Sequence, residues 1–192
     1  MRIAATVVLA LLLGTAQTPA QRGEDDSTGR EEFTAVALSA GGPRSNPVAG
    51  QLDISIERWS TQAERQRLLS TLGKGQTSML ETLRELPSIG RIKTPGELGW
   101  DVHYAHQVTG EDGGRRIFLA TDRPISVWEA VNRPRTIDYP FTFIELRVDK
   151  YGDGEGKLSL ATRVIASEDG RFVHLENWDT QPIALSEVRK KN

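Results

Sequence analysis

Hydrophobic and polar residues alternate along much of this chain, which is the pattern of β-strands. The alternation is clearest in QLDISIERW at 51–59, where apolar side chains stand at every second position from Leu52 to Ile56. Because successive side chains of a strand point to opposite faces of a sheet, this pattern predicts a half-buried strand. The same criterion predicts further strands at 33–40, 88–93, 101–109, 115–121, 141–149, 157–167, 171–178 and 182–189.

A helical pattern replaces the alternation after the second predicted strand. The first helix is expected to begin at Ser60 or Thr61, because Glu64 lies three residues after Thr61 and can complete a capping box with it. Gly73 is expected to end this helix, since glycine adopts the backbone conformation that commonly follows a helix C-terminus.

The second predicted helix reads SMLETLREL, with Ser78 as its N-cap, and it ends before Pro87. Tight turns rich in Gly, Asp and Glu separate several of the later strands, so consecutive strands are expected to be antiparallel neighbours. The expected fold class is therefore α+β and mainly β: an antiparallel meander that forms a sandwich or a partly closed barrel, with a two-helix insertion after the second strand.

The first twenty residues have the composition of a secretory signal peptide. Arg2 precedes an apolar run of about eleven residues, which is shorter than the roughly 20 that a membrane-spanning helix needs. We expect cleavage after Ala16 or Ala20; a buried N-terminal helix or strand is the alternative. The expected organisation is a signal peptide at 1–20, a flexible, highly charged tether at 21–32 and a single β-rich domain at 33–192.

The composition excludes several classes of protein. The 192 residues include 38% hydrophobic and 26% charged residues with a net charge of -2, so no preference for nucleic acid or an anionic membrane is expected. The absence of cysteine excludes disulfides, thiol nucleophiles and zinc–thiolate sites. We expect no cofactor, no membrane span in the mature chain, and a bacterial periplasmic or secreted location.

The glycine-rich stretch DKYGDGEGK at 149–157 suggests a calcium-binding loop. Compared with an EF-hand loop that starts at Asp149, Tyr151 and Leu160 occupy two positions that require oxygen ligands. Strand-like segments flank the stretch, so we interpret it as a hairpin turn; a different calcium site that includes Glu155 is the alternative. Positive φ angles are expected at Gly152, Gly154 and Gly156.

The histidines provide the remaining candidates for catalysis or metal binding. In HYAH at 103–106 the two rings are three residues apart, which places them on opposite faces of the predicted strand. His103 or His106 could combine with His174 and an acid such as Glu145 in a hydrolase or metal-dependent enzyme. No nucleophile-elbow, zincin or dinucleotide-binding motif supports this alternative.

The segment at 121–140, TDRPISVWEAVNRPRTIDYP, is the strongest candidate for a binding surface. It connects two predicted strands and is longer than most loops, and long connections are often functional. Arginine and aromatic side chains are enriched where proteins contact their partners. The favoured interpretation of the segment is nevertheless that it covers an open end of the sheet, with Trp128 and Tyr139 in the core, and catalysis is a further alternative. The candidate binding residues are Trp128, Asn132, Arg133, Arg135, Asp138 and Tyr139.

Three segments together carry a resemblance to a protein family. RRIFLATDRPISVWEA, NRPRTIDYPFTFIELRVDK and GEGKLSLAT resemble parts of a family of uncharacterised secreted bacterial proteins. The similarity extends over about residues 33–190 rather than over a catalytic signature. The resemblance implies export and a shared fold, and it implies no known activity, cofactor or functional residue.

These observations favour a non-catalytic function. We expect an exported, monomeric binding or envelope-associated protein with a protein or small-molecule partner in the cell envelope. Two alternatives remain at this point: a carrier with an apolar cavity inside the sheet, and the hydrolase or metal-dependent enzyme described above.

Overall fold

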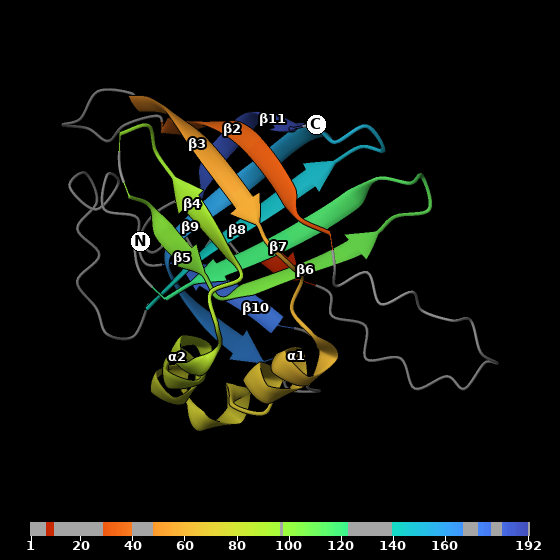
Figure 1. Ribbon diagram of the computed structural model, residues 1–192. Coiled ribbons are helices and arrows are strands. Elements are labelled where there is room, and N and C mark those ends of the chain that lie inside the picture. Colours follow the sequence, from red (N-terminus) through yellow and green to blue (C-terminus); the bar gives the residue numbers. More distant parts are fainter. Residues whose placement is uncertain are drawn as a thin grey trace.

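Antiparallel strands dominate the fold in the part of the chain that the computed structural model describes (Figure 1). The described residues are 7–9, 29–39, 48–96, 98–122, 140–166, 173–177 and 182–191. Within these ranges, eleven strands join in one sheet. The strands are β1 (Val7–Leu9), β2 (Glu31–Ser39), β3 (Val48–Ile56), β4 (Gly90–Lys93), β5 (Trp100–Val102), β6 (Tyr104–Thr109), β7 (Arg115–Thr121), β8 (Phe141–Val148), β9 (Asp153–Ala166), β10 (Val173–Asn177) and β11 (Ile183–Lys190).

The sheet curls into a nearly closed barrel, which confirms the expected α+β, mainly β class. The strand order is β5-β4-β3-β2-β11-β9-β8-β7-β6, while β10 pairs with β9 and β1 pairs with β10. The runs β2 to β5 and β6 to β9 are meanders that follow the chain order. β11 lies between β9 and β2, so the last strand of the chain is hydrogen-bonded to one of the first strands.

Side chains that point into the barrel form one apolar core. Leu52, Ile54 and Ile56 of β3 are almost fully buried, as the alternation at 51–59 predicts. Trp59 follows β3 and belongs to the same cluster. Burying apolar surface contributes about 25 cal/mol per Å², so this cluster is the main source of stability. Its other members are Phe33, Ala35, Ala37, Ile89, Ile92, Val102, Ala105, Ile117, Leu119, Ile144, Leu146, Val148, Leu158, Leu160, Ile183, Leu185 and Val188.

A helical layer packs at one end of the barrel, next to β10 (Figure 1). It consists of α1 (Gln62–Leu69), the short 3₁₀ helix η2 (Leu72–Lys74) and α2 (Gln76–Glu85). The helices bury apolar side chains against strands β7 to β10 and form a second, smaller core. Its buried members are Leu68, Leu83, Leu86, Ala120, Phe141 and Val164.

Gln76 joins the helical layer to the sheet. Its side-chain Nε2 donates to the carbonyl oxygen of Val164 at 2.6 Å, and its Oε1 accepts from the Val164 N–H at 2.8 Å. The primary amide thus contacts β9 as the peptide group of a neighbouring strand does. The backbone pairing of β9 with β8 ends at Thr162, opposite Phe141. Gln76 therefore bonds β9 two residues beyond the end of this pairing, at Val164.

The start of the first helix is confirmed, but its end and the start of the second are not. Thr61 is the N-cap of α1 and forms the expected capping box with Glu64. The helix ends at Leu69, before Gly73. The predicted N-cap Ser78 is wrong, because α2 already begins at Gln76 after Gly75. Gly75 has a φ of 98°, which lets the chain turn directly from η2 into α2.

The strand expected at 101–109 is divided in two at His103. Val102 and Ala105 are both buried, although a continuous strand would place positions three residues apart on opposite faces. At the break, the His103 N–H donates to Ala120 O at 3.1 Å. β5 pairs with β4, whereas β6 pairs with β7. The inward and outward orientation of the side chains is therefore set separately in each of the two strands.

At the N-terminus, β1 pairs with β10 with Val8 opposite His174. The rest of 1–28 lies outside the described residues, and the signal peptide stays a prediction. β2 begins at Glu31, two residues before the expected strand. Among the described residues, no helix is long and apolar enough to cross a membrane.

Candidate functional site

The six candidate binding residues of the 121–140 segment lie outside the described part of the chain. Description stops at Asp122 and resumes at Pro140. The structure therefore neither brings them together nor separates them. They are Trp128, Asn132, Arg133, Arg135, Asp138 and Tyr139.

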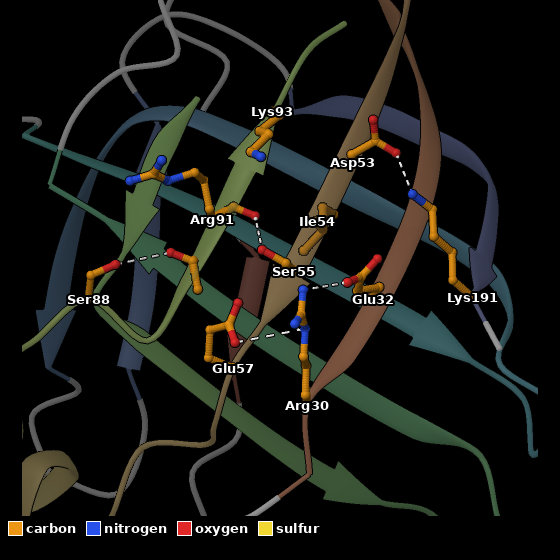
Figure 2. A pocket seen from close by; sticks show the side chains of 11 residues that line it. Arg30, Glu32, Asp53, Ile54, Ser55, Glu57, Ser88, Arg91, Lys93 and Lys191 are labelled. Atoms are coloured by element: carbon orange, nitrogen blue, oxygen red, sulfur yellow. Dashed lines mark hydrogen bonds and ion pairs between the residues drawn. The ribbon is translucent and has the colours of Figure 1, made fainter. Parts of the chain in front are cut away.

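The described residues contain a polar groove of about 480 Å³ on the outer face of β2, β3 and β4 (Figure 2). This volume is within the range of ligand-binding pockets, about 300–1,000 Å³. The groove was not predicted from the sequence. Its lining residues are Arg30, Glu32, Asp53, Ile54, Ser55, Glu57, Ser88, Gly90, Arg91, Lys93 and Lys191.

The strand alternation explains why this face is polar. Since Leu52, Ile54 and Ile56 point into the barrel, the intervening side chains of β3 point outward. The pairing of β3 with β4 then places Asp53 opposite Lys93 and Ser55 opposite Arg91. The alternation at 51–59 therefore indicated a polar outer face on this strand. It did not indicate which strands lie beside it and complete the groove.

One end of the groove holds an arginine that two glutamates share. Arg30 Nη2 donates to Glu32 Oε1 at 2.8 Å, while Arg30 Nε lies 3.8 Å from Glu57 Oε2 (Figure 2). The second distance is too long for a hydrogen bond. The Glu57 side chain is also 55% exposed. Glu57 is thus an incompletely neutralised carboxylate among the described residues of this face.

The other end of the groove holds Asp53 between two lysines. Although Lys93 is its cross-strand neighbour, Asp53 Oδ1 accepts from Lys191 Nζ at 2.9 Å. Lys191 is held in place because its backbone N–H donates to Glu32 O at 2.7 Å. Lys93 has no ion-pair or hydrogen-bond partner within the described ranges. Figure 2 draws no contact to its ammonium group.

Arg91 is directed toward β5 and is already paired. Its Nη2 and Nε both donate to Asp101 Oδ1, at 2.8 and 3.1 Å. These hydrogen bonds hold the pKa of Asp101 below its ordinary value, although partial burial acts in the opposite direction. Arg91 is therefore less available to a ligand than Lys93.

Both hydroxyl groups of the groove contact backbone carbonyls, and that of Ser88 also donates to Asp101 Oδ1 at 3.4 Å. Ser55 Oγ donates to Arg91 O at 3.3 Å, and Ser88 Oγ donates to Gly90 O at 3.2 Å. No histidine is among the lining residues. The carboxylate beside Ser88 is Asp101, whose pKa is lowered mainly by its hydrogen bonds from Arg91, so it is a weak general base. This arrangement is suited to binding charged groups.

The histidines proposed for an enzyme have different surroundings. His103 Nδ1 lies 2.9 Å from Leu86 O, and its Nε2 lies 4.0 Å from Asp122 Oδ1. His106 lies on β6 beside Tyr104, with ring centroids 6.4 Å apart. Burial and the charge of Arg65 lower the pKa of His106. No contact joins either ring to the other within the described structure.

His174 and Glu145 complete the set of proposed enzyme residues. His174 lies on β10, opposite Ile165 of β9. Glu145 Oε1 accepts from Arg116 Nη2 at 2.7 Å and from Arg147 Nε at 2.9 Å. Burial acts to raise the pKa of Glu145, but these two arginines outweigh it and lower the pKa. Glu145 is therefore an ion-pair partner of arginines.

The 149–157 stretch forms the predicted hairpin turn. Asp149 N donates to Asp153 O at 2.8 Å, and Asp149 Oδ1 accepts from the N–H groups of Tyr151 and Asp153. Only Gly152, with a φ of 92°, has the expected positive φ. Gly154 belongs to β9 instead, where a Cβ would lie 1.9 Å from Arg147 O.

The expectation of positive φ at Gly154 and Gly156 was wrong. Both residues are extended strand positions that pass close to the backbone of β8. Across the described ranges, no group of three or more His, Cys, Asp or Glu side chains could hold a metal ion.

Comparison with known proteins identifies no relative. No protein-family model, curated protein or solved structure matches this chain. The resemblance to uncharacterised secreted proteins therefore stays a prediction, and the groove must be interpreted from its own chemistry.

Proposed function

We propose that this protein is an exported, non-catalytic binding protein of the bacterial envelope that holds a polar partner in the groove of β2, β3 and β4. The observation that supports this proposal most directly is the chemistry of the groove. Lys93 and Glu57 are available to a partner, while both serine hydroxyls are bonded to backbone carbonyls and the Ser88 hydroxyl also to Asp101, which Arg91 holds. Such a surface supplies mainly charged contacts.

The scaffold is suited to binding without rearrangement. β3 is hydrogen-bonded to β2 on one side and to β4 on the other, and its inner face is packed into the core. Outward side chains on such a strand have fixed backbone positions. Binding to a preorganised surface loses less conformational entropy than binding that orders a loop.

The outer face is favoured over the barrel interior as the binding surface. The buried apolar side chains that point into the barrel from the described strands pack against one another in one cluster. A carrier of apolar ligands would need open volume among them. The segment at 123–139 remains a second proposed docking surface, based on the sequence of residues such as Trp128 and Arg133.

The proposal can be tested with a photo-crosslinker placed inside the groove. The exported chain would carry p-benzoylphenylalanine in place of Ser55, whose side chain points into the groove (Figure 2). A matched chain would carry it in place of Glu81, an exposed residue of α2. After illumination in a bacterial host, we expect adducts of defined mass from position 55 only.

A competition step makes this result specific. Excess unlabelled wild-type protein should suppress the adduct, whereas excess protein that carries both Lys93→Gln and Glu57→Gln, and so lacks the two available charges, should suppress it less. Equal adducts from positions 55 and 81, or no adduct from position 55, would contradict binding at the groove.

A further inference from the structure

The groove has opposite uncompensated charges at its two ends. Lys93 has no partner in the described chain, and Glu57 has only a 3.8 Å contact with an arginine that Glu32 already occupies. The other charged groups of this face are paired at hydrogen-bonding distance. A complementary ligand therefore needs a negative group at the Lys93 end and a positive group at the Glu57 end.

The strand register sets the distance between these ends. Lys93 lies opposite Asp53, and Glu57 is four residues further along the chain from Asp53. Four residues of extended chain correspond to about 13 Å, at 3.2–3.4 Å per residue. A small zwitterion such as a free amino acid is too short to reach both charges.

An extended peptide has the required geometry. Side chains four residues apart in a strand lie on the same face and are separated by the same distance of about 13 Å. No aromatic side chain lines the groove, so it offers no stacking surface for sugar rings or nucleobases. The polar lining, the charge separation and the absence of aromatic residues together favour a peptide.

We infer that the groove binds an extended peptide segment of a partner protein that carries an acidic and a basic side chain four residues apart. The acidic side chain contacts Lys93 and the basic side chain contacts Glu57. This inference rests on the proposed function, because it specifies the partner of the same groove.

Lys191 has a positioning role in this arrangement. Its ammonium group neutralises Asp53, which is the cross-strand neighbour of Lys93. The ion pair between Lys191 and Asp53 of β3 thus leaves Lys93 available to a ligand. An exposed ion pair of this kind contributes only weakly, so several contacts must act together.

The inference can be tested by NMR titration of the full mature protein with defined peptides. The probe is the pentapeptide ESTSK with blocked ends, and its composition-matched control is EKSTS, whose charges are adjacent. At low salt, where charges are least screened, ESTSK should shift amide resonances of β3 and β4 and bind more tightly than EKSTS. Lys93→Gln and Glu57→Gln should each weaken ESTSK binding about two- to fivefold, as expected for one exposed ion pair.

Charge-reversal variants of Glu57 and Lys93 should change which peptide the protein prefers. A purely structural role of these residues would not change that preference. Glu57→Lys makes both ends positive, so this variant should prefer ESTSE, by about two- to fivefold over wild type. Lys93→Glu should instead prefer KSTSK. Lys74→Gln removes one exposed positive charge from η2, outside the groove, and should leave every affinity unchanged.

Several outcomes would overturn the inference. These are equal affinities for ESTSK and EKSTS, a wild-type preference for ESTSE, or charge-reversed variants that do not change their preferred peptide. If such a result accompanies a specific crosslink at position 55, only the ligand assignment fails. If the crosslink is also absent, the proposed function fails as well.

Discussion

Arg115 and Glu31 form a two-pronged ion pair across the inside of the barrel. Arg115 Nη1 and Nη2 lie 2.8 and 3.0 Å from the two carboxylate oxygens of Glu31, although the residues are 84 positions apart. Gln107 Oε1 accepts from the same guanidinium at 2.9 Å, and Lys190 Nζ lies 3.2 Å from Glu31. The cluster connects β2 with β7, which are not neighbours in the sheet.

This cluster should make stability depend on pH. Burial acts to raise the pKa of Glu31, but the hydrogen bonds and charges of Arg115 and Lys190 outweigh it and lower the pKa. A lowered pKa means that the stabilisation is present above the unfolded-state value of 4.5 and is lost as the pH falls through the folded-state pKa. Glu31→Gln should destabilise the protein at neutral pH by about 1–3 kcal/mol, since Arg115 loses the charge of its partly buried carboxylate partner.

The measurement is denaturant unfolding of wild type and Glu31→Gln as a function of pH. The difference between them should shrink below about pH 4.5. Glu32→Gln is a matched control, because Glu32 is the next residue, points to the outer face and forms an exposed pair with Arg30. It should cost less than about 1 kcal/mol. Equal losses for both variants would contradict the buried role of Glu31.

Alanine substitution can test which of the two predicted N-cap residues, Thr61 and Ser78, stabilises the start of a helix. Thr61→Ala removes the side chain that accepts from Glu64 N and should lower the free energy of unfolding by about 1 kcal/mol. Ser78→Ala lies inside α2 and should change it by less than about 0.5 kcal/mol. Thermal unfolding of the two variants provides the comparison. A larger loss from Ser78→Ala would place the N-cap at the residue that the sequence pattern favoured.

The 149–153 turn should be sensitive to Gly152. Gly152→Ala would place a methyl group at a φ of 92° and 2.5 Å from Lys190 Cβ, so we expect the free energy of unfolding to fall by about 1–3 kcal/mol. Denaturant unfolding of this variant and wild type gives the difference.

Calcium chloride should leave the unfolding temperature of wild type unchanged, because Asp149 Oδ1 already accepts two backbone N–H groups. A rise in unfolding temperature with calcium concentration would show binding to the folded state.

His106 should titrate below its ordinary pKa of 6.5, because burial and the charge of Arg65 disfavour its protonated form. For a histidine with a lowered pKa, the unfolded state binds the proton more readily, so stability decreases as the pH falls below 6.5. His106→Gln should reduce this decrease. NMR titration of the imidazole resonances gives the pKa directly, and a value above 6.5 would contradict the prediction.

The sequence predicted strongly alternating elements well. β7 at Arg115–Thr121 was predicted with its observed bounds, and the capping box of Thr61 and Glu64 was predicted residue by residue. These features depend on local periodicity and local hydrogen bonds. The break at His103 was missed because each half of the segment follows a different partner strand, which is long-range information.

The groove could not have been predicted for the same reason. Its floor requires the pairing of β3 with β4, and its charge pattern requires Lys191 to reach Asp53 from 138 residues away. Alternation showed that Asp53, Ser55 and Glu57 would share a polar face. It could not show which residues would neutralise them, and that determines which charges remain for a partner.

The contact between Gln76 and Val164 also affects how molecules of this protein behave toward one another. Beyond the end of its ladder with β8, β9 offers a peptide group to which a strand of another molecule could add. The amide of Gln76 occupies both the N–H and the carbonyl of Val164. A helix side chain thus occupies the position that a strand of another molecule would need, which disfavours edge-to-edge association at this point.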